Sequence, residues 1–415
     1  MSKVKYGAYL ILPLKYNEGE LDKERLSLKC PVTRVDTMDL GENIKLMFNG
    51  KNDMKVGSVY EVPVNILAES LGGDQFSVEN NSGKFSFSLM SSYIYTFHTR
   101  VAFLCLGLDL ECMEALYAIY NPGFSENNSG FYIVKNNEEL PIDFAENLEI
   151  FAGSFGMKKF FDGESSILLE SYTYILALCD ERFQSLEELR RKTFNLHQMV
   201  SIDTPNEDDS EEDIRYIYAV KDLSIGGYRW GICVSSQTIS YAVADPDMDF
   251  ISEMNAQSKD GMPLVLLALY EKYTCLRFTE LIAGISKKKS QQLKELKDIM
   301  LKFRAFGTIS PANVSRWNNV RQILAYLQEV CGIDHAIEDI SSKLNILTEQ
   351  QKEIEQSRSD LIMNLITIFG IVSILASVQS IIQILCDGNV IIWTGTILTT
   401  GILAVVFGLA LRYKK

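Results

Sequence analysis

Polar side chains interrupt a long uncharged segment near the C-terminus, and their chemistry is the most informative feature of the sequence. Between Leu361 and Leu385 there is no charged residue, yet the segment carries hydroxyl and amide groups. The candidates for a polar, pore-lining face are Asn364, Thr367, Ser373, Ser377, Ser380 and Gln383, with Asn389 shortly after them. Polar atoms are costly against lipid, so this face should point at protein or at water.

Two arrangements would satisfy these groups. On a helix with about 100° per residue, four small residues share an arc of roughly 80°: Gly370, Ser373, Ser377 and Ser380. Small residues at these spacings let a neighbouring helix approach closely. Alternatively, the hydroxyls and amides line a water-filled pore in a ring of protomers. The small residues favour packing, whereas the amides of Asn364, Gln379 and Gln383 favour a pore, because packing seldom requires them.

A second group of candidates lies in the middle of the chain. Tyr228, Arg229 and Trp230 offer two aromatic rings and a guanidinium that could stack on and pair with an adenine nucleotide. The same residues also fit a strand with ordinary cross-strand contacts. The sequence has no Walker loop and no HExxH, GxSxG or GxGxxG motif, and the carboxylates of Asp245–Asp249 fit a loop. We therefore predict that the protein is not an enzyme.

Composition limits the partners. The 415 residues carry a formal net charge of −14, which argues against nucleic acid as a partner. The eight cysteines form no CxxC pair and the three histidines have no ligand-like spacing, so no structural zinc site and no covalent cofactor is expected. Scattered, reduced thiols fit a cytosolic location for most of the chain.

Two uncharged runs near the C-terminus predict a transmembrane hairpin. Leu361–Leu385 and Val390–Leu411 each exceed the roughly 20 residues that a helix needs to cross a bilayer, which makes a buried core hairpin a poor alternative. Only four residues separate the runs, so the two helices must be antiparallel. The loop of the hairpin has no basic residue. The basic residues lie on the two flanks of the hairpin: Lys352, Arg358, Arg412, Lys414 and Lys415. The positive-inside rule then predicts a multi-pass protein of the inner (plasma) membrane with both termini in the cytoplasm.

The rest of the chain predicts an α+β cytosolic region with a β-rich N-terminal part. Residues 1–206 contain short β-branched and aromatic segments, among them Tyr6–Leu14, Ile44–Phe48 and Phe131–Lys135, followed by a helix over 165–200. The acidic run 207–213 is predicted to be a solvated linker. A second α/β part covers 214–310, with strands in Ile214–Val220 and Tyr228–Ala244 and a long helical region from Pro263 to about Phe306.

A stalk helix is predicted over 311–360, with Ser310 and Pro311 as its start signal. Apolar residues recur with heptad spacing from the stalk into the first span: Ile337, Ile340, Leu344, Leu347, Ile354, Leu361, Leu365, Ile368, Val372 and Leu375. Neither proline nor glycine occurs between Ile333 and Phe369, so one helix should enter the bilayer unbroken. Sustained heptads favour packing against copies of the same chain, although an antiparallel pair within one protomer remains the alternative.

This order of elements resembles the CorA family of divalent-cation channels. The resemblance covers about Pro263 to Lys415, and the stretch LVLLALYEKYTCLRFTELI looks like the apolar helix that precedes the stalk in that family. It implies a homopentamer whose first span lines the pore, and a divalent cation as ion or ligand. The family's Gly-Met-Asn triplet is absent: the sequence here is Cys386-Asp387-Gly388-Asn389, in which Asn389 takes the place of the asparagine. Selectivity for Mg²⁺ is therefore not implied.

A branch of CorA-like proteins without the triplet is associated with type III CRISPR antiviral defence, and this layout is similar to it. That resemblance implies an oligomeric membrane channel or effector gated by a nucleotide second messenger, a conjugate of S-adenosylmethionine and AMP. Two alternatives stay open at this point. One is a constitutive divalent-cation (Mg²⁺-type) transporter, and the other is a membrane-tethered binding protein without a pore.

Overall fold

The computed structural model describes residues 4–36, 39–51, 54–123, 130–136, 138–205, 221–225, 228–284, 290–385 and 401. The chain divides into two compact units, an N-terminal unit, Met1–Ser341, and a C-terminal unit, Ser342–Lys415. The strands are β1 (Val4–Lys15), β2 (Val32–Thr33), β3 (Gly57–Glu61), β4 (Gln75–Asn80), β5 (Gly83–Phe97), β6 (Val101–Leu110), β7 (Phe131–Lys135), β8 (Glu138–Ile142), β9 (Lys158–Lys159), β10 (Tyr172–Cys179), β11 (Lys221–Ile225), β12 (Trp230–Val234) and β13 (Thr238–Ala244).

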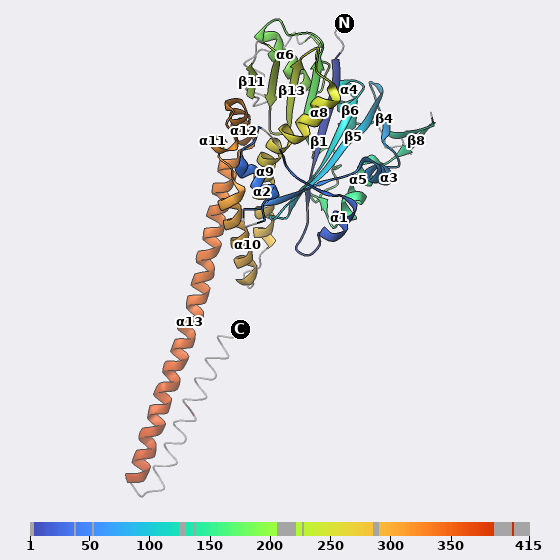
Figure 1. Ribbon diagram of the computed structural model, residues 1–415. Coiled ribbons are helices and arrows are strands. Elements are labelled where there is room, and N and C mark those ends of the chain that lie inside the picture. Colours follow the sequence, from blue (N-terminus) through green and yellow to red (C-terminus); the bar gives the residue numbers. More distant parts are fainter. Residues whose placement is uncertain are drawn as a thin grey trace. The chain divides into compact units, whose positions relative to one another are not determined.

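Helices are interspersed among these strands, and the elements described after β13 are all helical (Figure 1). They are α1 (Lys23–Lys29), α2 (Glu42–Asn49), α3 (Val64–Leu71), α4 (Met113–Tyr120), α5 (Phe144–Gly153), α6 (Leu186–His197), α8 (Phe250–Lys259), α9 (Gly261–Gly284), α10 (Ser290–Lys302), the π-helix η1 (Phe303–Gly307), α11 (Pro311–Val314), α12 (Asn318–Val330) and α13 (Ile333–Leu385).

One large, mostly antiparallel sheet organises the N-terminal unit. Its main order is β11-β12-β13-β10-β1-β6-β5-β4-β7-β8, with β3 and β2 continuing from β5 and with β9 beside β1. The pairing of β10 with β13 is parallel, and Ile175 lies opposite Ser240. The long strand β1 lies between β10 and β6, so both of its edges are hydrogen-bonded. This central place explains why β1 is apolar on both faces.

Successive residues of β1 point to opposite faces of the sheet, and helices cover both faces. The side chains of Ala8, Leu10 and Leu12 belong to an apolar core that also contains buried residues of α1, α3, α4, α5 and α6. On the other face, Tyr9 donates a hydrogen bond of 2.8 Å to the carbonyl of Met254 in α8. Helix α9 packs on this second face, where Tyr270 stacks on Phe97 at 4.1 Å.

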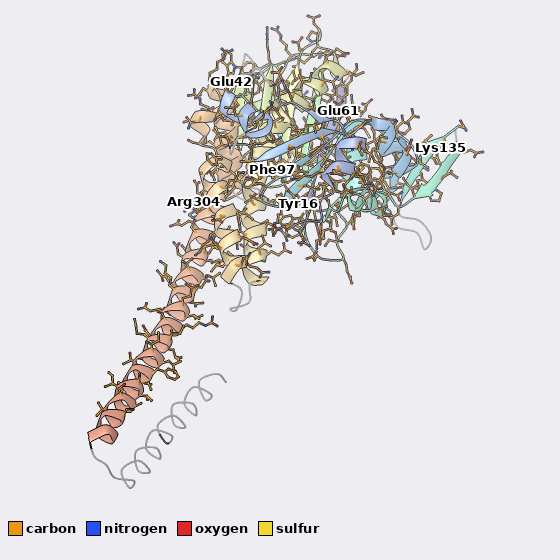
Figure 2. The ribbon with its side chains drawn as sticks, turned by 60° about the horizontal axis from the view of Figure 1, so that its bottom comes forward. Tyr16, Glu42, Glu61, Phe97, Lys135 and Arg304 are labelled. Atoms are coloured by element: carbon orange, nitrogen blue, oxygen red, sulfur yellow. The ribbon has the colours of Figure 1, made fainter. Side chains whose placement is uncertain are left out.

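Buried charges anchor the C-terminal half of α9. The Lys15 ammonium at the end of β1 contacts Asp162 at 2.9 Å and Glu280 at 2.7 Å. Arg277 contacts Glu280 at 2.6 Å and donates a further hydrogen bond to the carbonyl of Tyr16, which is labelled in Figure 2. Because Lys15 and Arg277 are almost fully buried, pairing with carboxylates removes most of the penalty for taking them out of water.

Several predicted elements are confirmed. Tyr6–Leu14 lies within β1, Phe131–Lys135 is β7, and the apolar helix after Pro263 is α9. The predicted linker 207–213 and the predicted strand Ile214–Val220 lie outside the described residues.

Two predictions for the N-terminal part are wrong. Ile44–Phe48 is helical, within α2, because Ile44, Met47 and Phe48 are buried at helical spacing. The helix predicted over 165–200 is only partly present, since Tyr172–Cys179 forms β10 and only Leu186–His197 forms a helix. All eight residues of β10 are buried. A strand that is covered on both faces shows no alternation, so its apolar run is easily mistaken for a helix.

The single stalk helix predicted over 311–360 is also wrong. The structure has α11 and α12 first, and the long helix α13 begins only at Ile333. Gly332, just before it, has φ of +63°, a left-handed conformation that glycine adopts readily and that ends the preceding helix. From Ile333 to Leu385 the helix runs without a break, as predicted.

Gly156, which follows α5, gives a test of the packing in the N-terminal unit. It has φ of +80°, and a Cβ atom there would overlap the carbonyl oxygen of Glu20, whereas a Cβ at Gly153 would meet nothing within 4 Å. We expect Gly156→Ala to lower the free energy of unfolding by about 2 kcal/mol or more, and Gly153→Ala to change it little. Thermal unfolding of the full chain in detergent, followed by circular dichroism, measures both. Equal melting temperatures for the two variants would contradict the described backbone at Gly156.

Candidate functional site

Helix α13 is long and apolar enough to cross a membrane. It contains an 18-residue window with a mean hydropathy of 2.4, and no part of this window is buried within the chain. Large apolar side chains are exposed all around the helix, including Met363 at 63%, Ile366 at 64% and Ile374 at 65%. Such a surface is costly in water, and by its length and composition this segment could span a membrane. The second uncharged run, Val390–Leu411, lies outside the described residues except for Gly401, and Asn389 also lies outside them.

The hydroxyl groups of this segment are exposed but already hydrogen-bonded. Thr367 donates to the carbonyl of Met363 at 2.8 Å, and Ser377 donates to the carbonyl of Ser373 at 2.8 Å. Ser380 donates in the same way to the carbonyl of Ala376 at 3.0 Å. Each bond uses the hydroxyl proton within the helix and leaves the oxygen lone pairs on the helix surface. These residues therefore tolerate lipid better than free hydroxyls would, and toward water they present hydrogen-bond acceptors, which suit cations.

Helical geometry does not bring all the predicted pore residues to one face. Ser373, Ser377 and Ser380 share one narrow arc, whereas Thr367 lies roughly 100° from the centre of that arc. Asn364 lies roughly 160° from the centre of that arc, and Gln383 roughly 100°. Asn364 is exposed. In a ring of straight helices, a pore lined by the three serines would therefore not also be lined by Asn364.

The heptad positions of α13 change their environment along the helix. Ile333, Ile340 and Leu344 are buried, while Ile354 is 43% exposed. Further on, Leu361, Leu365, Ile368 and Val372 are half-buried, and every other residue with a described side chain between Asp360 and Ile371 is exposed. The heptad pattern is thus part of a buried core only near the start of α13.

The predicted nucleotide-binding group is partly dispersed. Tyr228 and Arg229 are exposed, whereas Trp230 begins β12 and packs on Tyr241 with ring centroids 5.9 Å apart. Tyr228 has φ of +65°, an uncommon conformation for a residue with a side chain. The three residues are adjacent in sequence, but only the exposed pair is free to meet a ligand.

A cleft at the start of α13 brings together residues that the sequence did not single out. Its volume is about 700 Å³, and it lies within the N-terminal unit. The lining residues come from α9, η1, the connector 308–310, α11, α12 and the first turns of α13: Glu271, Arg304, Thr308, Ile309, Ser310, Pro311, Ala325, Gln328, Glu329, Gly332, Ile333, Asp334, His335 and Ile337. Arg304, labelled in Figure 2, also contacts the Ser341 hydroxyl of α13 at 3.4 Å. Clefts of this size commonly hold small molecules.

Glu271 is the buried carboxylate of this cleft, with only 1% of its surface exposed. One carboxylate oxygen accepts a hydrogen bond from the backbone N–H of Ile309 at 2.8 Å, and the other accepts one from the Gln328 amide at 2.8 Å. Burial raises the pKa of Glu271 to about 7, and the negative charge of Asp334 adds to this effect. A titratable group so perturbed within a cleft is a candidate functional residue. In the sequence Glu271 is one of two glutamates in α9, and nothing in the local pattern distinguishes it from Glu280.

The comparisons with known proteins identified no relative of this chain. No family model matches the chain, and searches of the curated proteins and of the solved structures found no match. Helix α13 and the cleft at its start are therefore the features of this chain that bear on function.

The raised pKa of Glu271 makes the stability of the fold depend on pH. The pKa of Glu271 is about 7 in the folded state, above the ordinary value of 4.5 that applies to the unfolded chain. The folded state therefore binds the proton more tightly than the unfolded state does. The folded state should therefore lose up to about 3 kcal/mol from this group as the pH rises from 4.5 to 7. The side chain introduced by Glu271→Gln cannot ionise. The free energy of unfolding of this variant minus that of the wild type should therefore increase by that amount as the pH rises from 4.5 to 7. Urea unfolding of the full chain in detergent at several pH values measures the difference, with exposed Glu338→Gln as control. A difference that is independent of pH would contradict the assignment.

The apolar surface of α13 predicts how the protein partitions. A chain that ends at Ser341 lacks the apolar window, so we expect it in the soluble fraction, whereas the full chain should sediment with membranes and resist carbonate extraction. The double variant Ile366→Lys and Ile374→Lys is the matched control, because it keeps the length but charges the helix surface, and it should also lose membrane integration. Carbonate-soluble full-length protein would exclude a membrane-spanning role for α13.

Proposed function

We propose that this protein is a CorA-like, homo-oligomeric membrane channel or effector that a cytosolic ligand gates. The observation that carries the proposal is the continuity of α13. The helix starts at the cleft, where Ile333 and Ile337 line the wall, and runs unbroken to an apolar, lipid-compatible segment bearing serine hydroxyls. A helix without a break can transmit a displacement of its first turns along its length.

The proposed assembly is a pentamer with two spans per copy and both termini in the cytoplasm. Its pore face is the arc of Ser373, Ser377 and Ser380, whose hydroxyl oxygens would face permeating cations. The ligand would bind the open state of the cytosolic region more tightly than the closed state and thereby shift the population toward opening. The resemblance to the CRISPR-associated branch implies a nucleotide messenger of the S-adenosylmethionine–AMP type, and antiviral defence as the setting.

Conduction is tested with the full chain in liposomes. We expect ligand-dependent ion flux or dye release, and Ser377→Leu should reduce it at least about tenfold, because a branched apolar side chain would close a hydroxyl-lined constriction. Ser377→Thr retains the hydroxyl and should conduct, and Ile368→Leu lies on the opposite side of the helix and should also conduct. Light scattering in detergent checks that the variants keep their stoichiometry.

The outcomes separate the three candidate functions. Undiminished flux in Ser373→Leu and Ser377→Leu would remove these serines from the pore. A monomer in detergent with no flux under any messenger would favour a tethered binding protein. Flux of Mg²⁺ without a messenger would favour a constitutive transporter.

A further inference from the structure

Among the described residues, three charged side chains are buried, and one of them differs from the other two. They are Lys15, Arg277 and Glu271. Lys15 and Arg277 are each paired with carboxylates at 2.6–2.9 Å. Glu271 has no such partner in the described part of the chain, and the one charged side chain that influences it is Asp334, of the same sign. The fold thus neutralises its buried cations and leaves its buried anion without a counter-charge.

An unpaired buried charge is costly, and two neutral hydrogen bonds compensate for it only in part. The donors to Glu271, the Ile309 N–H and the Gln328 amide, occupy about two of the four lone-pair positions that a carboxylate offers. The remaining positions can accept hydrogen bonds from a ligand. Glu271 lines the cleft, so its carboxylate lies in the wall that a ligand bound there would contact.

The cleft wall has a charge and a shape that suit such a ligand. The carboxylates of Glu271 and Asp334 line it, together with the guanidinium of Arg304. Apolar side chains of Ile309, Ile333 and Ile337 line the same space, so the cleft can also cover a carbon chain. No cluster of three or more metal-ligating side chains occurs among the described residues, which favours an organic cation over a metal ion.

We propose that the cleft at the start of α13 binds a small organic cation, an amine or a guanidinium, whose charged nitrogen pairs with Glu271. The carbon chain of the ligand lies along the isoleucines, and Asp334 at the rim meets a second donor group. The bound ligand contacts α9, the connector 308–310, α12 and the first turns of α13 together. Any effect on gating rests on the proposed function, but the binding itself does not.

The test is isothermal titration calorimetry, in which the full chain in detergent is titrated with agmatine and, separately, with putrescine. We expect saturable binding that weakens about tenfold for each pH unit below 7, since Glu271 must lose its proton to pair with the cation. Near pH 7 binding should release a fraction of a proton, which titrations in two buffers of different ionisation enthalpy reveal. 1,4-Butanediol, of similar length but neutral, and the dianion glutarate should not bind.

Variants make the result specific to the cleft. Glu271→Gln should weaken binding at least about tenfold and abolish its pH dependence, and exposed Glu338→Gln, on α13 outside the cleft, should bind like the wild type. Asp334→Asn at the rim should weaken binding severalfold, and it carries the test if Glu271→Gln fails to fold. Absence of saturable binding up to roughly 10 mM, equal binding of the diol, or unchanged binding in the Glu271 or Asp334 variants would overturn the proposal. Flux is not a readout here, so a protein that binds the amines but never conducts would contradict only the proposed channel.

Discussion

The apolar surface of α13 is the constraint on which the rest of this protein depends. Between Leu361 and Val378 the helix exposes isoleucine, methionine, phenylalanine and leucine side chains on all sides, and no other described part of the chain covers them fully. Such a surface is costly in water, and its length and hydropathy are those of a helix that could span a membrane. The same helix begins in the N-terminal unit with the buried Ile333 and Ile340, so one unbroken helix connects the core of that unit to the apolar segment.

Helix α9 organises the charges of the N-terminal unit. Its C-terminal half is fixed to β1 through Lys15 and Arg277, whose two positive charges are balanced by the carboxylates of Glu280 and Asp162. Its middle carries Glu271, whose charge is unbalanced and whose hydrogen bonds connect α9 to the connector 308–310 and to α12. The ion pairs at one end stabilise the packing of α9 on β1, while the contacts of Glu271 depend on its protonation, because burial raises its pKa to about 7. A site placed beside the first turn of α13 is well situated to influence that helix.

The serines of α13 illustrate why polar residues in a membrane segment do not by themselves establish a pore. Ser377 and Ser380 donate their protons to carbonyls of their own helix, which lowers the cost of facing lipid. The same bonds leave oxygen lone pairs outward, which is the arrangement that a cation pathway would use. Their angular separation from Asn364 further shows that a polar residue count overstates how many groups can line one passage.

The sequence alone determined the features that depend on local pattern. Uncharged length predicted the lipid-compatible helix, and the absence of proline and glycine after Ile333 predicted its continuity. The hydrophobic pattern gave a wrong prediction for β10, because a strand buried on both faces shows no alternation. It also gave a wrong prediction for Ile44–Phe48 in α2, because so short a segment fits both a strand and a helix. Glu271 could not be recognised, because its importance comes from Ile309, Gln328 and Asp334, which are distant in sequence. Only the tertiary structure encloses that carboxylate without a counter-charge, since burial and pairing are properties of the packed chain and not of any segment.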